Sequence, residues 1–386
     1  MKFEWKKVKL GEITSVITKG TTPTSLGYSF TNQGINFIKS ESITADKFLD
    51  KTKYCHISKE THEKLKRSQL QINDILFSMA GVFLGKTGIV TVSDIPANTN
   101  QAVAIIRVIP ELADTNYIYY YLNQKNIIAY INSSTGQSAQ PNINLKQIGQ
   151  LEIVLPSIAT QKKIASVFNA LDDKIALNNK INDNLEQQAQ TLYRKYFSEA
   201  GNTGELADVC DFSKDKIAVS ELSVGNYFST ENMLPDKKGA IEATNLPAVQ
   251  QTTACHRGNV LVSNIRPYFK KILYCQREGG CSNDVLCFVP KTPELSAYLY
   301  CTLYADNFFN FMVAGSKGTK MPRGDKKQIM TYKVCIPFEN QLKDFNAAVL
   351  PMFQMIENNR RENMKLSLVR DTLLPKLMAG KIDISS

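Results

Sequence analysis

The stretch that decides the fold is residues 161–197, QKKIASVFNALDDKIALNNKINDNLEQQAQTLYRKYF, which contains no glycine or proline. Apolar and amide side chains recur in it at alternating intervals of four and three residues, at Ile164, Phe168, Leu171, Ile175, Asn178, Asn182, Leu185, Ala189, Leu192 and Tyr196. This spacing keeps successive positions on one side of a helix and is typical of a coiled-coil seam. We therefore predict a long helix that packs along this seam against a second helix.

The second seam is a copy of the first, displaced by 181 residues. It lies within residues 342–377 and consists of Phe345, Val349, Met352, Ile356, Asn359, Asn363, Leu366, Arg370, Leu373 and Leu377. Arg370 is its main departure from the pattern. Two such seams in one chain can cover each other, so we predict a pair of long antiparallel coiled-coil helices.

Two local features of these helices give further expectations. Pro351 lacks the N–H that a helix interior needs, so we expect the second helix to break there. By the repeat, the first helix would break near Ala170. The adjacent Asp172 and Asp173 are expected on an exposed face of the first helix.

Each seam carries two asparagines at matching places, Asn178 and Asn182 in the first and Asn359 and Asn363 in the second. A buried asparagine is costly unless it is paired, and it then fixes the register of the helices. In an antiparallel pair related by a pseudo-twofold axis, these four would meet near the centre. The alternative, in which the helices splay and the amides face water, stays open.

The chain that precedes each seam is also repeated. Gln147-Ile148 and Leu155-Pro156 match Gln328-Ile329 and Ile336-Pro337 at the same offset of 181 residues. The fold class that follows is mixed α+β, with two similar globular domains separated by the two helices. The predicted boundaries are 1–155 for the first domain, 156–200 for its helical region, 201–336 for the second domain and 337–386 for the second helical region. Within the domains we predict strands at 35–38, 88–92, 102–108 and 285–289, and helices around 115–130 and 294–311.

Composition narrows the class of protein. The chain has 386 residues and a net charge of +10, and an excess of lysine and arginine favours binding to polyanions. No apolar run reaches the length of a membrane span, and the basic start has no apolar stretch behind it, so neither a membrane anchor nor a signal peptide is expected. The eight cysteines are then expected to be reduced, mostly buried thiols in a cytoplasmic protein.

The residues give no set of catalytic groups. Residues 81–87 place three residues between the two glycines where a phosphate-binding P-loop needs four. The adjacent pairs Cys55-His56 and Cys255-His256 lack a Cys-x-x-Cys partner, so we expect no metal site. No nucleophile, base and orienting group stand out together, and we predict a chain without chemistry of its own.

Two terminal segments carry a family resemblance. The run RDTLLPKLMAGKIDI at 370–384 resembles the end of the specificity subunits of type I restriction-modification enzymes, and Trp5–Ile13 with the following Lys19–Pro23 resembles their opening. The resemblance covers the whole chain, including the order domain, helix, domain, helix. It implies two target-recognition domains, each reading one half of a split, asymmetric site on double-stranded DNA.

The resemblance also implies partners and cofactors. The helices would act as a spacer and as the docking surface for two modification methyltransferase subunits, which would bind S-adenosylmethionine. A separate restriction and translocase subunit would use ATP and Mg²⁺. A helix of about 28 residues spans roughly 42 Å, slightly more than one turn of B-DNA at about 34–36 Å, which agrees with this arrangement.

Residues that contact DNA must be polar, lie in loops and reach base edges or phosphates. In the first domain the candidates are Lys19, Thr21, Lys86, Ser134, Thr135, Gln137, Ser138 and Gln140. In the second domain they are Asn264, Arg266, Tyr268, Lys270, Lys271, Lys317, Lys320 and Arg323. Arginine is suited to bidentate contact with guanine and glutamine to adenine, while lysine more commonly holds phosphate.

Two other functions compete with DNA recognition at this point. A repeated helical hairpin with incidental basic charge would make a structural adaptor that organises other proteins. A stand-alone nucleic-acid enzyme is a third reading, which the missing motifs disfavour. Salt-dependent binding to random DNA separates the first two, and an assay of methyl transfer by the isolated chain tests the third.

Overall fold

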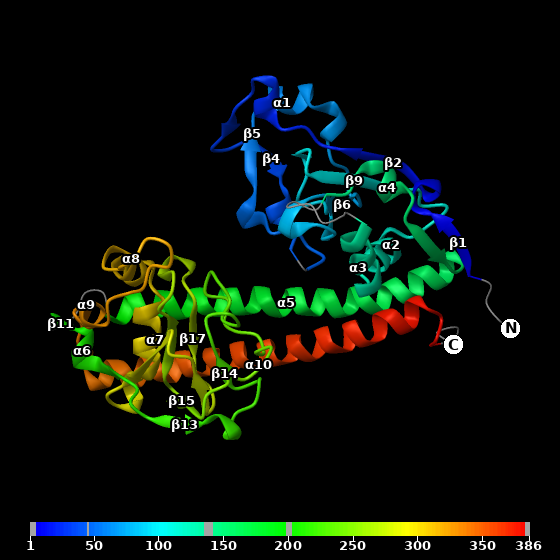
Figure 1. Ribbon diagram of the computed structural model, residues 1–386. Helices are drawn as coiled ribbons and strands as arrows, with labels where there is room; N and C mark the ends of the chain where they lie inside the picture. Colours follow the sequence, from blue (N-terminus) through cyan, green and yellow to red (C-terminus); the bar gives the residue numbers. More distant parts are fainter. Residues whose placement is uncertain (1–4, 45, 135–141, 198–202, 383–386) are drawn as a thin grey trace. The chain divides into compact units, whose positions relative to one another are not determined.

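The computed structural model describes residues 5–44, 46–134, 142–197 and 203–382. The chain divides into two compact units, the first made of Met1–Ala176 with Asn363–Ser386 and the second of Leu177–Glu362. Two helices of 40 residues each contribute a segment to both units: α5, Ile158–Phe197, and α10, Glu339–Met378. They are the long green and the orange-to-red helices of Figure 1.

The described residues of unit 1 form three sheets. The first is an antiparallel sheet with the strand order β2-β9-β6-β7. Its strands are β2 at Thr14–Lys19, β9 at Val103–Val108, β6 at Ile75–Ser78 and β7 at Thr87–Ile89. A second sheet has the order β3-β5-β4-β8, with β3 at Phe30–Thr31, β5 at Cys55–Ile57, β4 at Ile35–Ile38 and β8 at Ala97–Thr99. The pair β1, Lys6–Lys9, and β10, Glu152–Leu155, completes the set. The helices are α1 Lys59–Lys64, α2 Thr115–Leu122, α3 Lys125–Ser134 and α4 Leu145–Gly149, with short 3-10 helices η1 Leu10–Ile13, η2 Pro23–Leu26, η3 Ser40–Ser42, η4 Lys51–Lys53, η5 Lys66–Ser68 and η6 Gly81–Phe83.

Unit 2 repeats this plan. Its first sheet has the order β12-β19-β16-β17, with β12 at Cys210–Phe212, β19 at Val285–Pro290, β16 at Val260–Ser263 and β17 at Ile272–Tyr274. Its second sheet has the order β13-β15-β18-β14, with β13 at Lys216–Ala218, β15 at Gln251–Cys255, β18 at Gly279–Cys281 and β14 at Tyr227–Phe228. The pair β11, Thr203–Glu205, and β20, Lys333–Cys335, corresponds to β1 and β10. The helices are α6 Leu206–Val209, α7 Ser296–Tyr304, α8 Asp306–Ala314 and α9 Lys326–Met330, with 3-10 helices η7 Val219–Glu221, η8 Pro267–Phe269 and η9 Pro293–Leu295.

The hydrophobic core of each unit includes side chains from the long helices. In unit 1 the buried rings of Tyr117 and Phe168 share a core with Leu377, and Trp5 packs at its margin. The ring of Trp5 lies 3.1 Å from where a Cβ on Gly380 would stand, so β1 begins beside the end of α10. In unit 2 the ring centroid of Phe197 lies 4.9 Å from that of Tyr298 and 5.1 Å from that of Phe345. The domains are therefore built onto the helices by shared cores.

The predicted breaks in the long helices are wrong. The helix α10 continues through Pro351, and α5 continues through Ala170. Pro351 is exposed, while Val349 and Phe353 on either side of it are buried at 0% and 4% exposure. Because the packing of these neighbours holds the backbone, and water can reach the face where the proline removes a hydrogen bond, tertiary contacts outweigh the local penalty.

The predicted strands coincide with β4, β7, β9 and β19 to within three residues at each end. The two predicted helices each consist of two helices in the structure. Asn123 and Gln124 separate α2 from α3, and Ala305 separates α7 from α8. The periodicity of apolar residues continues across these short turns because both members of each pair face the same core.

Candidate nucleic-acid interface

The loop that follows β2 in unit 1 is held tightly by its neighbours. A Cβ on Gly20 would lie 1.9 Å from the carbonyl oxygen of Thr99, so only glycine fits there. The N–H of Thr21 donates to that same carbonyl at 3.1 Å, and its hydroxyl accepts from Nη2 of Arg67 at 3.1 Å. Lys19, at the end of β2, is exposed. The structure therefore places Lys19 and Thr21 together and adds Arg67, which is not among the predicted residues.

A second loop of unit 1 joins β6 to β7 and carries Lys86. Its ammonium lies 5.0 Å from the ring centroid of Phe83. Residue Ala80 forms a β-bridge with Asn142, and the N–H of Ile143 donates to the carbonyl of Met79 at 3.0 Å. Ser134 is the last residue of α3, and Thr135, Gln137, Ser138 and Gln140 lie outside the described residues.

Unit 2 brings together its two candidate segments at the equivalent place. The segment after β16 holds Asn264 and Arg266, and the segment before α9 holds Arg323. Ile265 forms a β-bridge with Arg323, the N–H of Arg266 donates to the carbonyl of Pro322 at 2.8 Å, and the N–H of Gly324 donates to that of Asn264 at 3.2 Å. Segments that are nearly sixty residues apart in sequence thus form one surface.

The two loops that follow β6 and β16 share an unusual backbone. In unit 1, Gly81 and Gly85 have φ values of 68° and 79°. At an offset of 185 residues, Arg266 and Lys270 adopt φ values of 50° and 51°. A non-glycine residue in this left-handed region is strained, and such strain tends to concentrate at functional sites. The second unit therefore places two cations where the first has glycines.

Two buried polar atoms of the segment after β16 lack protein partners. Among the described residues, Nε of Arg266 and Oδ1 of Asn264 are buried and make no hydrogen bond. Buried polar groups are otherwise almost always paired. Tyr268 is 49% exposed, and its ring lies 4.8 Å from that of Phe269. Two unpaired polar atoms thus lie beneath a surface that carries exposed aromatic rings.

Three of the six candidate cations of unit 2 face carboxylates. The ammonium of Lys317 lies 2.6 Å from Asp325, Nη2 of Arg323 lies 3.0 Å from Asp284, and the ammonium of Lys270 lies 2.9 Å from Asp306. Lys237 also binds Asp306, at 2.8 Å. The ion pairs with Lys237 and Lys270 hold the pKa of the Asp306 carboxyl below its ordinary value.

Two other lysines of that set, Lys320 and Lys271, differ from each other. Lys320 is exposed. Lys271 donates from its ammonium to the backbone carbonyl of Thr230, and burial lowers its pKa. Lys271 therefore ties the loop after β16 to the backbone at Thr230, whereas the side chain of Lys320 is open to solvent.

Known proteins resemble this chain in both sequence and fold. Residues 2–187 match the family model described as type I restriction modification DNA specificity domain. The chain is 24% identical to the specificity subunit of the type I restriction enzyme MjaIX from Methanocaldococcus jannaschii, with 99% of this chain and 94% of the relative covered. The solved S subunit of a type I restriction-modification system from M. genitalium has the same fold, with a TM-score of 0.60, 16% identity, and 97% of this chain and 96% of that chain covered.

The chain belongs to the specificity subunits of type I restriction-modification systems. It is also 25% identical to the specificity subunit of the type I restriction enzyme HindI from Haemophilus influenzae, over 50% of this chain and 41% of that subunit. A specificity subunit is the DNA-recognising, non-catalytic member of its system. In the described part of this specificity subunit, no helix has the length and apolarity to cross a membrane, and no three His, Cys, Asp or Glu side chains are grouped as metal ligands.

The seam of the specificity subunit contains polar contacts in unit 2. Asn178 and Asn182 are buried at 1% and 6% exposure. Nδ2 of Asn178 donates to Glu362 at 2.8 Å, and Nδ2 of Asn359 donates to Oδ1 of Asn182 at 2.8 Å. The two helix segments are antiparallel here, because the residue number rises along α5 as it falls along α10. Asn363, the fourth member of the predicted set, is half-buried and belongs to unit 1.

The expectation that Asp172 is exposed is wrong. Asp172 is 6% exposed and accepts hydrogen bonds from Nη1 of Arg370 at 2.8 Å and from the hydroxyl of Tyr120 at 2.7 Å. Arg370, the departure from the apolar seam, is thus the partner that a buried carboxylate requires. Asp173 is exposed, as expected. Seam periodicity alone does not reveal an ion pair between helices.

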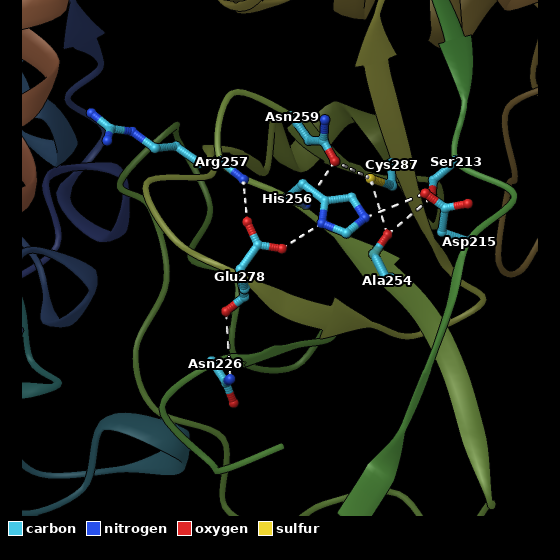
Figure 2. Close-up of polar contacts among 9 residues, drawn as sticks. All are labelled: Ser213, Asp215, Asn226, Ala254, His256, Arg257, Asn259, Glu278 and Cys287. Atoms are coloured by element: carbon cyan, nitrogen blue, oxygen red, sulfur yellow. Dashed lines mark hydrogen bonds and ion pairs between the residues drawn. The ribbon is translucent and has the colours of Figure 1, made fainter. Parts of the chain in front are cut away.

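A further polar cluster of unit 2 surrounds His256 (Figure 2). Its Nδ1 contacts Oε2 of Glu278 and its Nε2 lies 3.3 Å from Oδ2 of Asp215. Glu278 also accepts from the N–H of Arg257 at 3.2 Å. The contact with Glu278 is the main reason that the pKa of His256 is raised, and it lowers the pKa of Glu278. With both ring nitrogens engaged by carboxylates, His256 ties three turns together.

Arg67, Lys237 and the acids that pair with the candidate cations were not predicted from the sequence. Lys237 lies in the turn Pro235-Asp236-Lys237-Lys238-Gly239, whose composition is a turn signal with paired lysines. Its N–H donates to the carbonyl of Lys270 at 3.0 Å. That signal was available in the sequence, but the contact with Lys270 was not, because it joins loops far apart along the chain.

Proposed function

We propose that this specificity subunit reads a bipartite, asymmetric site on double-stranded DNA, one half with each of its target-recognition domains. The observation that carries the proposal is the pair of converging loops at the same place in each repeat, with different side chains. Gly81 and Gly85 stand where the second domain has Arg266 and Lys270. Because base recognition depends on side chains, two such loops favour different half-sites.

We assign the target-recognition domains to residues 1–155 and 201–336, and the spacer regions to 156–200 and 337–386. Within the second domain, Arg266 and Arg323 are proposed to contact guanine, because the guanidinium fork matches its O6 and N7 atoms. Lys317, Lys320 and Lys270 are proposed to contact phosphates. Asn264 and Tyr268 add an amide and an exposed ring to the same surface, while Lys271 supports it.

Within the first domain, Lys19, Thr21 and Lys86 form one part of the proposed interface. Gln137 and Gln140, with Ser134, Thr135 and Ser138, complete it as the segment suited to adenine, since a glutamine amide can pair with adenine in the major groove. The seam asparagines Asn178, Asn182, Asn359 and Asn363 are proposed to fix the register of the helices.

The proposed partners are two modification methyltransferase subunits and a restriction and translocase subunit. S-adenosylmethionine would be bound by the former, and ATP and Mg²⁺ by the latter. The proposed location is the cytoplasm, where such an assembly has access to DNA. The charge of +10 supports contact with DNA, since phosphate binding by Lys and Arg releases counterions.

The test is substitution of Arg323 by alanine in the full chain, assembled with its methyltransferase. We expect the methylated motif, mapped across a genome, to lose selectivity at one position in one half-site, with a discrimination loss of about 1–3 kcal/mol. Lys320→Ala serves as the control, because loss of a phosphate contact weakens binding to all sequences alike. An unchanged motif and unchanged affinity in the Arg323→Ala complex would remove this loop from the interface.

A further inference from the structure

Asp284 lies where the two candidate segments of unit 2 meet. It is in the turn between β18 and β19, and its backbone carbonyl accepts the N–H of Asn264 at 2.8 Å. Its carboxylate holds Nη2 of Arg323 at 3.0 Å. The turns that carry Asn264 and Arg323 therefore both contact the turn of Asp284. The backbone of Asp284 binds the first and its side chain binds the second.

The backbone of Arg323 is fixed independently of that side chain. Its N–H donates to the carbonyl of Lys317 at 3.0 Å, and the N–H of Lys317 donates back to Arg323 at 2.9 Å. The guanidinium end remains accessible, since the Arg323 side chain is 54% exposed. A guanidinium carries five N–H donors in a rigid fork, so a carboxylate on Nη2 orients the fork and leaves donors for a second acceptor.

The ion pair contributes little to folding, which points to another role. Arg323 and Asp284 are 54% and 41% exposed, and ion pairs with such exposure contribute little to stability. The loops stay joined through backbone bonds, at Asn264, Arg266 and Gly324, which do not use the carboxylate. The side chain of Asp284 is therefore dispensable for the fold, and its contact is with the guanidinium of Arg323 on the exposed surface.

We propose that Asp284 is a positioning residue that determines specificity by orienting Arg323 for guanine. This inference rests on the proposed function of the loop. Held by the carboxylate, the guanidinium presents its remaining donors in one direction, which suits the paired acceptors of a guanine edge. The negative charge of Asp284 also disfavours the approach of a phosphate, so Arg323 is kept from binding DNA of any sequence.

The test uses Asp284→Asn, which keeps the shape of the side chain and removes its charge. The full chain, assembled with its methyltransferase, is presented with a pool of DNA duplexes that have a randomised central segment, and bound duplexes are sequenced. We expect the preference for guanine at one position to fall about ten-fold, in line with the discrimination of one bidentate contact. Affinity for random duplex should rise, and the thermal unfolding midpoint should stay unchanged.

The matched control is Asp325→Asn, which removes an acid from the ion pair with Lys317 on the same surface. Asparagine preserves the helix cap that Asp325 provides through the N–H groups of Lys327 and Gln328. We expect this variant to keep the preference for guanine, because Lys317 is proposed to contact phosphate. An equal loss of preference in both variants would overturn the role of Asp284, since it would mark a general effect of charge.

A double-variant cycle separates the inference from the function on which it rests. If Asp284 acts through Arg323, Asp284→Asn has no further effect on base preference in an Arg323→Ala chain. If Arg323→Ala loses the preference while Asp284→Asn retains it, the positioning role fails and the proposed function stands. If Arg323→Ala itself retains every preference, the reading role of this loop fails and the inference fails with it.

Discussion

At the scale of single residues, the loop after β16 combines strain with positive charge. Arg266 and Lys270 have the left-handed backbone that Gly81 and Gly85 adopt at equivalent positions in the first repeat. The left-handed conformation costs an L-residue about 1–2 kcal/mol. Retaining arginine and lysine there indicates that their side chains serve the surface at the expense of stability.

Substitution Arg266→Gly is therefore expected to raise the free energy of unfolding by about 1 kcal/mol or less, because relief of strain exceeds the entropy that glycine loses on folding. The same variant should lose selectivity in the second half-site. Urea unfolding and duplex selection measure the two effects. Gly81→Ala is the counterpart, with open space around the added Cβ, and it should lower stability instead. A less stable Arg266→Gly chain with unchanged selectivity would contradict the expectation.

The candidate residues show where prediction from sequence ends. Arg266, Arg323 and Asn264 were selected as polar loop residues, and the structure brings them onto one surface. The strain at Arg266 could also have been anticipated, because the repeat aligns it with Gly81. The carboxylates of Asp284 and Asp306 could not, because each reaches its cation across a contact between separate turns that no local pattern encodes.

At the scale of elements, the seam periodicity predicted both long helices but misjudged their polar residues. Spacing identifies the buried face, and Ile164, Phe168 and Phe345 are buried as the pattern requires. It does not identify which polar residues on or near that face have partners. Asp172 is buried because Arg370 on the other helix neutralises it. Pro351 is tolerated for a similar reason, since packing across the chain overrides a local preference.

The turns around His256 predict a dependence of stability on pH. The pKa of His256 is raised above its ordinary value of 6.5. Its contribution to the stability of the fold is therefore complete below pH 6.5 and is lost as pH rises through the pKa of the folded state. The pKa of Glu278 is lowered from 4.5, so its contribution is present above that pH and is lost as pH falls through the lowered value. The cluster therefore stabilises unit 2 most between these two limits.

His256→Gln should remove the decline on the alkaline side of this window. The measurement is the thermal unfolding midpoint of the full chain between about pH 5 and pH 9, where histidine is the side chain expected to titrate. The other charged groups at this turn are Asp215 and Arg257, and neither is changed. His62, half-buried in unit 1 against Asn98, offers a control, since His62→Gln should leave the alkaline decline in place. A decline that persists in His256→Gln would place its origin elsewhere.

At the scale of the whole molecule, the repeat predicted from sequence is present in the sheets but is incomplete. The orders β2-β9-β6-β7 and β12-β19-β16-β17 correspond strand for strand. In the second sheets, β8 lies at an edge whereas its counterpart β18 is in the interior, paired with both β14 and β15. The strands of these second sheets have only two to five residues, too few for an apolar pattern to specify their order.

The contact between Trp5 and Gly380 has a consequence for chain connectivity. Both residues lie in unit 1, and Trp5 and Ile382 pack against the same core. The order in which the two repeats follow one another along the polypeptide is therefore not imposed by packing. A circular permutant, with a short flexible linker from Ile382 to Trp5 and new ends between Phe197 and Thr203, should fold and direct methylation to the same motif. Failure to fold, as judged by loss of a cooperative unfolding transition, would show that synthesis order matters to this duplicated architecture.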